Sequence, residues 1–437
     1  MSKPFHVVIV GAGPAGLAAA LALTKQPPVP SSPLQITVLE LRNGVQTLGG
    51  AVNLTPLALR YLDWLGAGQK LRPQASTVSA IELVAHRTGG LLGRLWPDVD
   101  AIRAQRQLLV EALRDTIYEL PQGKDDAKVE IKYGAKITNM QEFGTTENGG
   151  VRVTFVNTND KSAKEQVIEA DIIVGCDGIH SQVRNALIDP NREKTYSGKC
   201  NSYGYADLRK NGASPSELAK SWVRADGQPL ITDTTLVSKA NESLLVTYYE
   251  PSHEKLYLAF VQPMKEKKDA KEGWSVHGAD KEGIKKSIRE TFQGGSLKYL
   301  GDILDLCEEW FFFPVYMLPP EGEWYKGRAI VIGDAAHAMP PQGEGTGVAM
   351  EDGVLLARVL SRRGTRDVPT LFQDYETLRR PDIRDTYKET MARWNAPVPN
   401  GWFSTVMMEW FTWGFVKFMG RRKDYFSRDV RNRELPA

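Results

Sequence analysis

The stretch that decides the fold runs from Phe5 to Gly16 and reads FHVVIV-GAGPAG. Phe5–Val10 is a short, apolar and largely β-branched run, which is the composition of a buried parallel strand. The Ala/Leu-rich stretch that continues to Leu23 predicts a helix. After a Pro/Ser-rich loop, Gln35–Leu39 (QITVL) predicts a second strand. Strand, glycine turn, helix and strand in this order predict a β-α-β unit.

The glycine turn has the GxGxxG spacing of a dinucleotide-binding fingerprint. Gly11 permits a tight turn, Gly13 lets the backbone approach a pyrophosphate, and Gly16 lets the helix pack closely on the strand. The helix N-terminus offers free N–H groups to the phosphates, and Ala15 in this turn is expected to contact the cofactor as well. Glu40, at the end of the second strand, can accept hydrogen bonds from ribose hydroxyls, which favours FAD or NAD over NADP. The alternative is a strand–helix turn without a ligand.

The composition is that of a globular protein with ample material for a core. The residues are 42% hydrophobic and 25% charged. The length of 437 residues predicts two or three domains. Fifty-five Lys+Arg against 53 Asp+Glu give a net charge of +2, which does not favour a nucleic-acid partner. Cys176, Cys200 and Cys307 cannot form a complete disulfide framework, and no Cys/His spacing predicts a metal site. We therefore expect a cytoplasmic protein without a metal.

Two segments invite a targeting or membrane interpretation. Pro4–Thr24 carries no charge apart from His6, but its glycines and proline interrupt the helix that a signal peptide needs. Gly401–Gly420 holds three Trp and four Phe, yet Glu409 and Lys417 leave no uncharged stretch long enough to span a bilayer. We expect a packed helix there and no membrane contact; a membrane-surface helix is the alternative.

The rest of the chain alternates helical and strand patterns. Pro56–Leu65 and Arg106–Tyr118 carry the apolar spacing of helices. From about residue 200 to 265 several runs alternate in polarity, which predicts an antiparallel sheet. Arg328–Ile332 predicts another strand, followed by a glycine-rich turn and a helix from about Val348 to Leu360.

Two further motifs combine glycine and aspartate after short apolar runs. Gly175–Arg184 reads GCDGIHSQVR, and Gly333–Pro341 reads GDAAHAMPP. Because the second motif follows a predicted strand, Asp334 is expected at the carboxyl edge of a sheet, where α/β folds bind ligands. His337 in the same motif is expected to be a packed structural histidine.

These motifs resemble the DG and GD motifs of group A flavoprotein monooxygenases. This is the family of para-hydroxybenzoate hydroxylase, salicylate hydroxylase and many fungal natural-product oxygenases. Arg106–Leu109 (RQLL) is similar to the family's helix that carries an FAD-contacting arginine. The resemblance covers roughly residues 5–190 and 300–380, in the family's order. It implies an α/β fold with a Rossmann-like FAD-binding domain, an inserted, mainly antiparallel substrate sheet and a C-terminal helical segment.

The motif order predicts the domain boundaries. We expect the FAD-binding domain at 1–75, 100–190 and 275–380, the substrate-binding sheet at 76–99 and 191–274, and a helical region at 381–437.

The resemblance also implies FAD contacts. Arg106 is expected to contact FAD, and Asp334 to accept hydrogen bonds from the ribityl chain. Asp177 and Arg184 belong to a motif that the family uses for both FAD and NAD(P)H contacts. The alternatives are a solvated helix arginine for Arg106, a helix N-cap or turn aspartate for Asp334, and a turn aspartate and a surface arginine for the other two. Small residues would let the backbone approach the flavin, and those expected to do so are Gly49, Gly50, Ala51, Gly343, Gly345 and Gly347.

The function that the resemblance implies is that of an FAD-dependent monooxygenase. In the family's chemistry NAD(P)H reduces the flavin, O₂ forms a C4a-hydroperoxide, and one oxygen atom hydroxylates or epoxidises an organic substrate. Since the chain has a single dinucleotide fingerprint, NAD(P)H is expected to bind transiently. The alternatives are an FAD-dependent oxidase or dehydrogenase without oxygen insertion, and a flavin-binding protein without catalysis.

The substrate expectation rests on aromatic residues. Some family members carry an arginine on the first strand of the substrate sheet, where this chain has Tyr205, and its absence argues against a phenolate-type anion. A bulky, largely neutral aromatic or polycyclic molecule of secondary metabolism is expected instead. Tyr205 is the candidate catalytic residue, orienting the substrate through its hydroxyl; the alternative is a core tyrosine. The other aromatic residues considered are Trp222, Tyr203, Tyr248, Tyr249, Trp402, Trp410 and Trp413.

Overall fold

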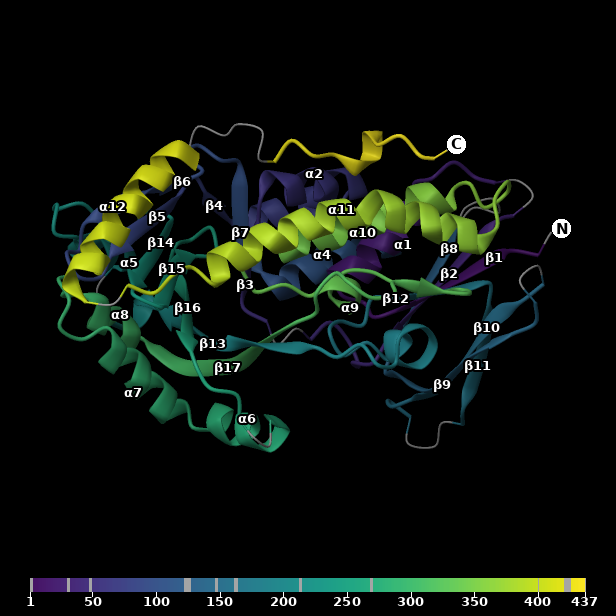
Figure 1. The fold of residues 1–437 in the computed structure, drawn as a ribbon, viewed down its shortest axis with the longest axis horizontal. Coiled ribbons are helices and arrows are strands. Elements are labelled where there is room, and N and C mark those ends of the chain that lie inside the picture. The colour runs from purple at the N-terminus through teal and green to yellow at the C-terminus, as the bar shows by residue number, and fades with distance from the viewer. Residues whose placement is uncertain are drawn as a thin grey trace.

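The structure is a computed structural model, and it describes residues 3–29, 32–46, 49–121, 127–145, 148–160, 164–211, 214–267, 270–399, 401–419 and 426–436. In Figure 1 the parallel sheet lies toward one end of the molecule and a larger sheet toward the other, with a long helix running along both.

A six-stranded sheet forms the first unit, in the spatial order β18-β19-β12-β1-β2-β8. Its strands are β1 (Phe5–Val10), β2 (Leu34–Glu40), β8 (Lys128–Tyr133), β12 (Ile172–Gly175), β18 (Tyr325–Lys326) and β19 (Ala329–Val331). All neighbours pair in parallel except β18 and β19. The chain leaves β1 toward β2 on one side, while β12 pairs on the other side. The carboxyl end of β1 is therefore a switch point, where open α/β sheets bind ligands.

Helices cover this sheet. They are α1 (Pro14–Thr24), α2 (Pro56–Leu65), α3 (Gly68–Leu71), α4 (Arg106–Tyr118), α10 (Gly345–Leu360) and α11 (Val368–Trp394). Helix α1 is buried from Pro14 to Leu23, which explains why its sequence is apolar on every side. It packs against α10, where a Cβ atom on Gly353 would lie 2.7 Å from the Ala19 nitrogen, so glycine lets the two helices approach closely.

Two small antiparallel sheets accompany the parallel sheet. One consists of β9 (Ala135–Phe143), β10 (Gly150–Asn157) and β11 (Gln166–Ala170). The other, in the order β3-β7-β4, consists of β3 (Ala51–Leu54), β4 (Ser76–Val78) and β7 (Ala101–Gln105).

A seven-stranded sheet forms the second unit, in the order β17-β13-β16-β15-β14-β5-β6. Its strands are β5 (Ile81–Ala85), β6 (Leu91–Leu95), β13 (Thr195–Asp207), β14 (Thr234–Lys239), β15 (Glu242–Tyr248), β16 (Lys255–Pro263) and β17 (Cys307–Met317). Its neighbours pair antiparallel except β14 and β5. The helices of this part of the chain are α5 (Pro215–Ser221), α6 (Ala270–Ala279), α7 (Lys281–Thr291) and α8 (Leu300–Asp305).

The boundary predicted at residue 275 is wrong. β17 pairs with β13, so residues 307–317 belong to the seven-stranded sheet and not to the parallel sheet. Ile284 and Ile288 of α7 and Ile303 of α8 share a hydrophobic core with that sheet. The predicted boundary failed because motif order does not reveal the pairing of β17 with a strand about a hundred residues earlier.

Helix α12 (Trp402–Met419) contacts β6 with one side only. Val416 is buried there, and Glu409 forms an ion pair with Arg87. The opposite side leaves large apolar side chains exposed, so only one side of the helix is packed, contrary to the expectation of a packed helix. They are Trp402, Phe403, Met407, Trp410, Phe411, Trp413, Phe415 and Phe418. Among the described residues, no helix is both long enough and apolar enough to cross a membrane.

Candidate cofactor and substrate site

The three fingerprint glycines play different roles in the structure. Gly11 has a φ of +102°, and a Cβ atom there would lie 2.5 Å from the Cys176 carbonyl oxygen. A Cβ atom on Gly16 would overlap the Gly11 carbonyl oxygen. The protein's own packing therefore requires both glycines. Gly13 differs, because a Cβ atom there would meet no described atom within 4 Å. The described protein therefore does not itself require a glycine at position 13, and the space beside it is open.

Glu40 lies beside this space. One carboxylate oxygen accepts a hydrogen bond from the Ala12 amide at 2.8 Å, and the other accepts one from the Arg42 amide at 2.9 Å. Each oxygen keeps a further lone pair, so the carboxylate can still accept hydrogen bonds from a diol. A cleft of about 110 Å³ opens here, lined by Ala12, Gly13, Pro14, Glu40, Arg42, Gly44, Val45, Gln46, Arg106, Val110 and Tyr133.

Arg106 lines the same cleft from the start of α4. Its side chain is exposed, and its amide donates to the Gly50 carbonyl at 3.3 Å. A Cβ atom on Gly49 would lie 2.9 Å from Arg106 Cδ, so glycine there lets the loop pass the arginine. Glu40 and Arg106, which are 66 positions apart in the sequence, are thus brought to one cleft.

The DG motif packs directly behind the fingerprint turn, through the contact of Gly11 with Cys176. Asp177 accepts hydrogen bonds at Oδ2 from the amides of Gln182 (2.6 Å) and Val183 (3.4 Å). Its Oδ1 is buried and has no partner among the described residues. Burial raises the pKa of Asp177, and its hydrogen bonds partly oppose that shift. Asp177 therefore stabilises its turn with one oxygen and keeps the other available.

Arg184, at the end of the DG motif, has a structural position. It is buried and donates to the carbonyls of Ala335 and Ile179, each at 2.8 Å. It therefore joins the DG motif to the GD motif, and begins the π-helical turn Arg184–Ile188.

Asp334 begins the short helix α9 (Asp334–His337), and its side chain is exposed. The N-cap of α9 is Gly333, and no side chain caps this helix, so Asp334 does not have the N-cap role considered as an alternative. A Cβ atom on Gly333 would lie 3.1 Å from the Ala15 Cβ. Ala15 therefore packs against the GD turn and brings it beside the fingerprint. Within the described ranges, the Asp334 carboxylate near that junction has no hydrogen-bond or ion-pair partner.

The glycines after the GD motif divide in the same way as the fingerprint glycines. A Cβ atom on Gly347 would lie 3.1 Å from the Ala58 Cβ, so this glycine serves the packing of α10 on α2. A Cβ atom on Gly345 would meet no described atom within 4 Å. Open space at the start of α10 is thus found at Gly345 and not at Gly347. Glu344, just before α10, forms an ion pair with Arg393 at 3.0 Å.

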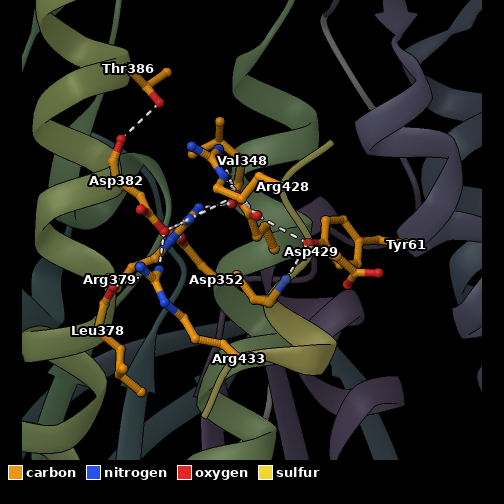
Figure 2. Close-up of polar contacts among 12 residues, drawn as sticks. Tyr61, Val348, Asp352, Leu378, Arg379, Asp382, Thr386, Arg428, Asp429 and Arg433 are labelled. Carbon is orange, nitrogen blue, oxygen red and sulfur yellow. Dashed lines mark hydrogen bonds and ion pairs between the residues drawn. The ribbon is translucent and has the colours of Figure 1, made fainter. Parts of the chain in front are cut away.

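A buried network of charged groups holds α10, which follows the GD motif, in place. Figure 2 shows Tyr61, Arg428 and Arg379 converging on acidic side chains of α10. Arg379 is fully buried and donates to Glu351 at 2.7 Å and to Asp352 at 2.6 Å. Glu351 also accepts hydrogen bonds from Arg428 and from the Tyr61 hydroxyl.

Asp352 carries this network into the GD turn. It accepts hydrogen bonds from the Gly333 amide and from His337 Nε2, each at 2.7 Å. Burial opposes ionisation of Asp352, but its contacts with His337 and Arg379 outweigh that effect and lower its pKa to about 2. His337 is 3% exposed, so the expectation of a packed structural histidine is confirmed.

A cluster of tyrosines covers one face of the seven-stranded sheet. Tyr203, Tyr249 and Tyr257 are buried together, with Tyr205 packed against them. The Tyr205 ring lies 5.2 Å from Tyr249 and 5.7 Å from Tyr257 between centroids. The Tyr205 hydroxyl donates to the Gly49 carbonyl at 3.4 Å, and Tyr257 packs on Gly50. The cluster therefore meets the loop that precedes β3.

The other aromatic residues do not join this cluster. Tyr248 and Trp222 belong to a different hydrophobic core. Tyr248 ends β15 and points to the face opposite the cluster, because successive strand residues point to opposite faces, whereas Trp222 follows α5. Trp402, Trp410 and Trp413 lie on α12. Tyr257 was missed by the sequence analysis, since its position opposite Tyr205 depends on the register of β13 with β16. Arg379 and Tyr61 were also missed, because their acidic partners lie far away in the sequence.

The arrangement fits FAD. The open space at Gly13 suits a pyrophosphate, and Glu40 suits a ribose diol. The exposed Asp334 and the available oxygen of Asp177 are further acceptors beside the same junction. No group of His, Cys, Asp and Glu suited to a metal ion occurs among the described residues.

Comparison with known proteins identifies relatives along most of the chain. A family model described as an FAD binding domain matches residues 5–266 and 321–390. The FAD-dependent monooxygenase atnJ of Arthrinium sp is 27% identical over 387 residues, 87% of this chain and 82% of that protein. The 6-hydroxynicotinate 3-monooxygenase of Pseudomonas fluorescens is 27% identical over 395 residues, 87% of this chain and 88% of that protein. The structure of HpxO of Klebsiella pneumoniae, complexed with FAD and uric acid, has a TM-score of 0.69 at 19% identity, covering 95% of this chain and 96% of that chain.

Proposed function

The chain belongs to the FAD-binding domain family as a flavoprotein monooxygenase, and we propose that it uses NAD(P)H and O₂ to hydroxylate or epoxidise an aromatic or polycyclic small molecule. The observation that carries the cofactor site is the open space at Gly13 beside Glu40. Secondary metabolism is the setting that the similarity to atnJ supports.

Residues from three motifs would hold the cofactor. The amides at the start of α1 would bind the pyrophosphate, and Glu40 the adenosine ribose. Arg106, on the other side of the cleft, supplies a positive charge. Asp334 would accept hydrogen bonds from the ribityl chain, and Asp177 would contribute its available oxygen. Gly50 and Ala51 lie where the loop meets the tyrosine cluster, which supports a place beside the flavin ring.

The bound FAD would supply the redox chemistry and the activation of O₂. The chain's own groups contribute position and electrostatics. The N-terminus of α10 at Gly345 carries partial positive charge and favours negative charge on a group placed there. The tyrosine cluster presents flat apolar surface that positions an aromatic ring and keeps water away. Tyr205 is the group proposed to orient the substrate, because its hydroxyl already reaches the Gly49 carbonyl.

The two units would divide the work. We place FAD on the six-stranded sheet and its helices, and the substrate against the tyrosine face of the seven-stranded sheet. With β17 and its neighbouring helices assigned to the second unit, residues 270–317 belong to the substrate side. NAD(P)H is proposed to bind transiently, because the chain has a single fingerprint.

Labelled oxygen tests the proposed reaction. The holoprotein is supplied with NAD(P)H, ¹⁸O₂ and a panel of aromatic acids and neutral polycyclic phenols. We expect at least one panel member to accelerate NAD(P)H oxidation and to yield a product that contains one ¹⁸O atom. Stimulated NAD(P)H oxidation with all the label in hydrogen peroxide would favour the oxidase alternative, and absence of NAD(P)H oxidation would favour a non-catalytic flavin protein.

An Asp334→Ala variant tests the cofactor site in parallel. The side chain of Asp334 is exposed and does not cap a helix, so its loss should leave the thermal unfolding temperature of the flavin-depleted protein unchanged. FAD occupancy should fall at least tenfold at limiting FAD. Normal occupancy would remove Asp334 from the proposed site.

A further inference from the structure

Arg103, in the middle of β7, is a buried cation without a counter-ion. The residue is 4% exposed, and its Nε has no hydrogen-bond partner among the residues that the structure describes. Among the described ranges of the chain, no carboxylate lies within ion-pairing distance of its guanidinium. Burying an unpaired charge is costly, and arginine cannot relieve that cost by losing its proton at neutral pH. A group outside the described chain is therefore expected to supply the missing charge.

The strand pairing places Arg103 on the face that meets the tyrosine cluster. In the small sheet Arg103 lies opposite Asn53 of β3 and Ser76 of β4, so the three side chains share one face. Two residues further along β7, Gln105 lies opposite Ala51 on the same face. Ala51 packs against the tyrosine cluster. Arg103 therefore lies between the small sheet and the proposed substrate face.

The tyrosines cannot neutralise Arg103. Tyr257 is the tyrosine whose negative charge would interact with Arg103. Burial raises the pKa of Tyr257, so its hydroxyl stays protonated. Burial lowers the pKa of Arg103 only to about 10, so the guanidinium keeps its charge at neutral pH. Asn53 provides a second unmatched group, because its Oδ1 is buried without a partner. A donor and an acceptor, both unpaired, thus stand on neighbouring strands.

We propose that Arg103 and Asn53 form an anion-recognition subsite, at which Arg103 pairs with a carboxylate or similarly acidic oxygen of the substrate and the Asn53 Oδ1 atom accepts a hydrogen bond from a neighbouring O–H or N–H group of the same substrate. This inference rests on the proposed function and narrows its substrate to one that carries an anionic group. A planar guanidinium suits a carboxylate because two parallel N–H···O bonds can form. We expected a neutral substrate because this chain has Tyr205 where some family members have an arginine. Arg103, on β7, supplies a positive charge from a different sheet. The sequence-based expectation considered only the substrate sheet and overlooked the small sheet opposite it.

A pair of probe ligands tests the subsite. The holoprotein and its Arg103→Gln variant are titrated with 2-naphthoate and with 2-naphthamide, which share a ring system and differ in charge. Perturbation of the FAD absorbance reports binding. We expect the wild-type protein to bind 2-naphthoate at least tenfold more tightly than 2-naphthamide, and Arg103→Gln to lose that preference while binding 2-naphthamide within twofold of wild type. A wild-type protein without preference for the anion, including one that binds neither probe, would overturn the proposal.

A matched control separates local from general charge effects. Arg152 is on the surface, where it pairs with Glu169, and Arg152→Gln removes the same charge from a distant sheet. This variant should retain the wild-type preference. An equal loss in Arg152→Gln would show that net charge, not the subsite, governs binding of the anion.

Thermal unfolding provides a readout that needs no ligand. Because Arg103 is buried without a partner, Arg103→Met should unfold at a higher temperature than the wild-type holoprotein. A lower unfolding temperature would show that Arg103 is bound by the protein itself, which contradicts the proposal. A shift of the FAD reduction potential in ligand-free Arg103→Gln would assign Arg103 to the flavin instead. FAD content and NAD(P)H oxidation of the wild type are measured in the same samples, so that failure of the proposed function is recognised separately.

Discussion

Substitution of Gly13 by alanine separates ligand binding from folding. Gly13 has φ −79° and ψ −178°, a conformation open to any L-residue, and an added Cβ would meet no described atom within 4 Å. The change should therefore not weaken the fold. Restricting the unfolded chain should instead stabilise it by about 0.4–1 kcal/mol.

The same methyl group would stand where the pyrophosphate approaches the backbone. Holding the phosphates away would cost at least one charge-assisted hydrogen bond, worth roughly 1.5–3 kcal/mol. Since each 1.4 kcal/mol is about tenfold in affinity, the FAD dissociation constant should rise by about 10- to 150-fold.

Gly16→Ala is the matched control, because its Cβ would overlap the Gly11 carbonyl oxygen. Overpacking of this kind costs about 1–3 kcal/mol, so this variant should unfold at a lower temperature. Thermal unfolding of flavin-depleted protein measures stability, and quenching of flavin fluorescence measures FAD affinity. The reasoning is refuted if Gly13→Ala binds FAD within twofold of wild type, or if it loses as much stability as Gly16→Ala.

Three other substitutions have defined outcomes. Asp352 has its pKa lowered from 3.8 to about 2, so its ionisation stabilises the fold above its ordinary pKa, and that stability is lost as the pH falls through 2. At neutral pH the free energy of unfolding of Asp352→Asn, measured by urea titration, should therefore be about 2 kcal/mol below that of the wild type. Between about pH 4 and pH 2 the variant should lose less stability than the wild type does. An equal loss of stability in both proteins over this pH range would contradict the reasoning. Tyr205→Phe should lower the amount of product formed per NAD(P)H oxidised, while FAD affinity and unfolding temperature stay unchanged. An unchanged product yield together with a stability loss of about 1 kcal/mol would show that Tyr205 is a core residue. Glu40→Ala should lower both the FAD affinity and the free energy of unfolding. The latter should fall by about 1–3 kcal/mol, because the Ala12 and Arg42 amides lose their acceptor. FAD titration and denaturant unfolding measure the two effects, and wild-type FAD affinity would exclude Glu40 from the site.

Local patterns were sufficient where one motif contains its own partners. The fingerprint turn is an example, since Gly16 contacts Gly11 and Ile9 within the first β-α-β unit, although the contact of Gly11 with Cys176 is long-range. Asp334 and Asp177 could also be placed, because each follows a short apolar strand at the carboxyl edge of the same sheet. The role of Gly347 could not be predicted, since it depends on the packing of α10 against Ala58.

Long-range pairing accounts for most of what the sequence did not reveal. Cys307–Met317 contains a proline and two glutamates, and only its pairing with β13 defines it as a sheet strand. Tyr61 and Glu351 are separated by 290 residues, and nothing local indicates that they meet. Arg103 is similar, because its sequence context suggests an ordinary strand residue and only its burial without a counter-ion draws attention to it.

The stoichiometry and release of the flavin test the central claim most directly. Purified or reconstituted protein, freed of unbound flavin by gel filtration, is assayed for flavin absorbance per chain before and after denaturation. The account predicts one FAD per chain, bound in the cleft between Glu40 and Arg106 and released completely on denaturation. A protein that takes up no FAD, or one that keeps its flavin after denaturation, would contradict it.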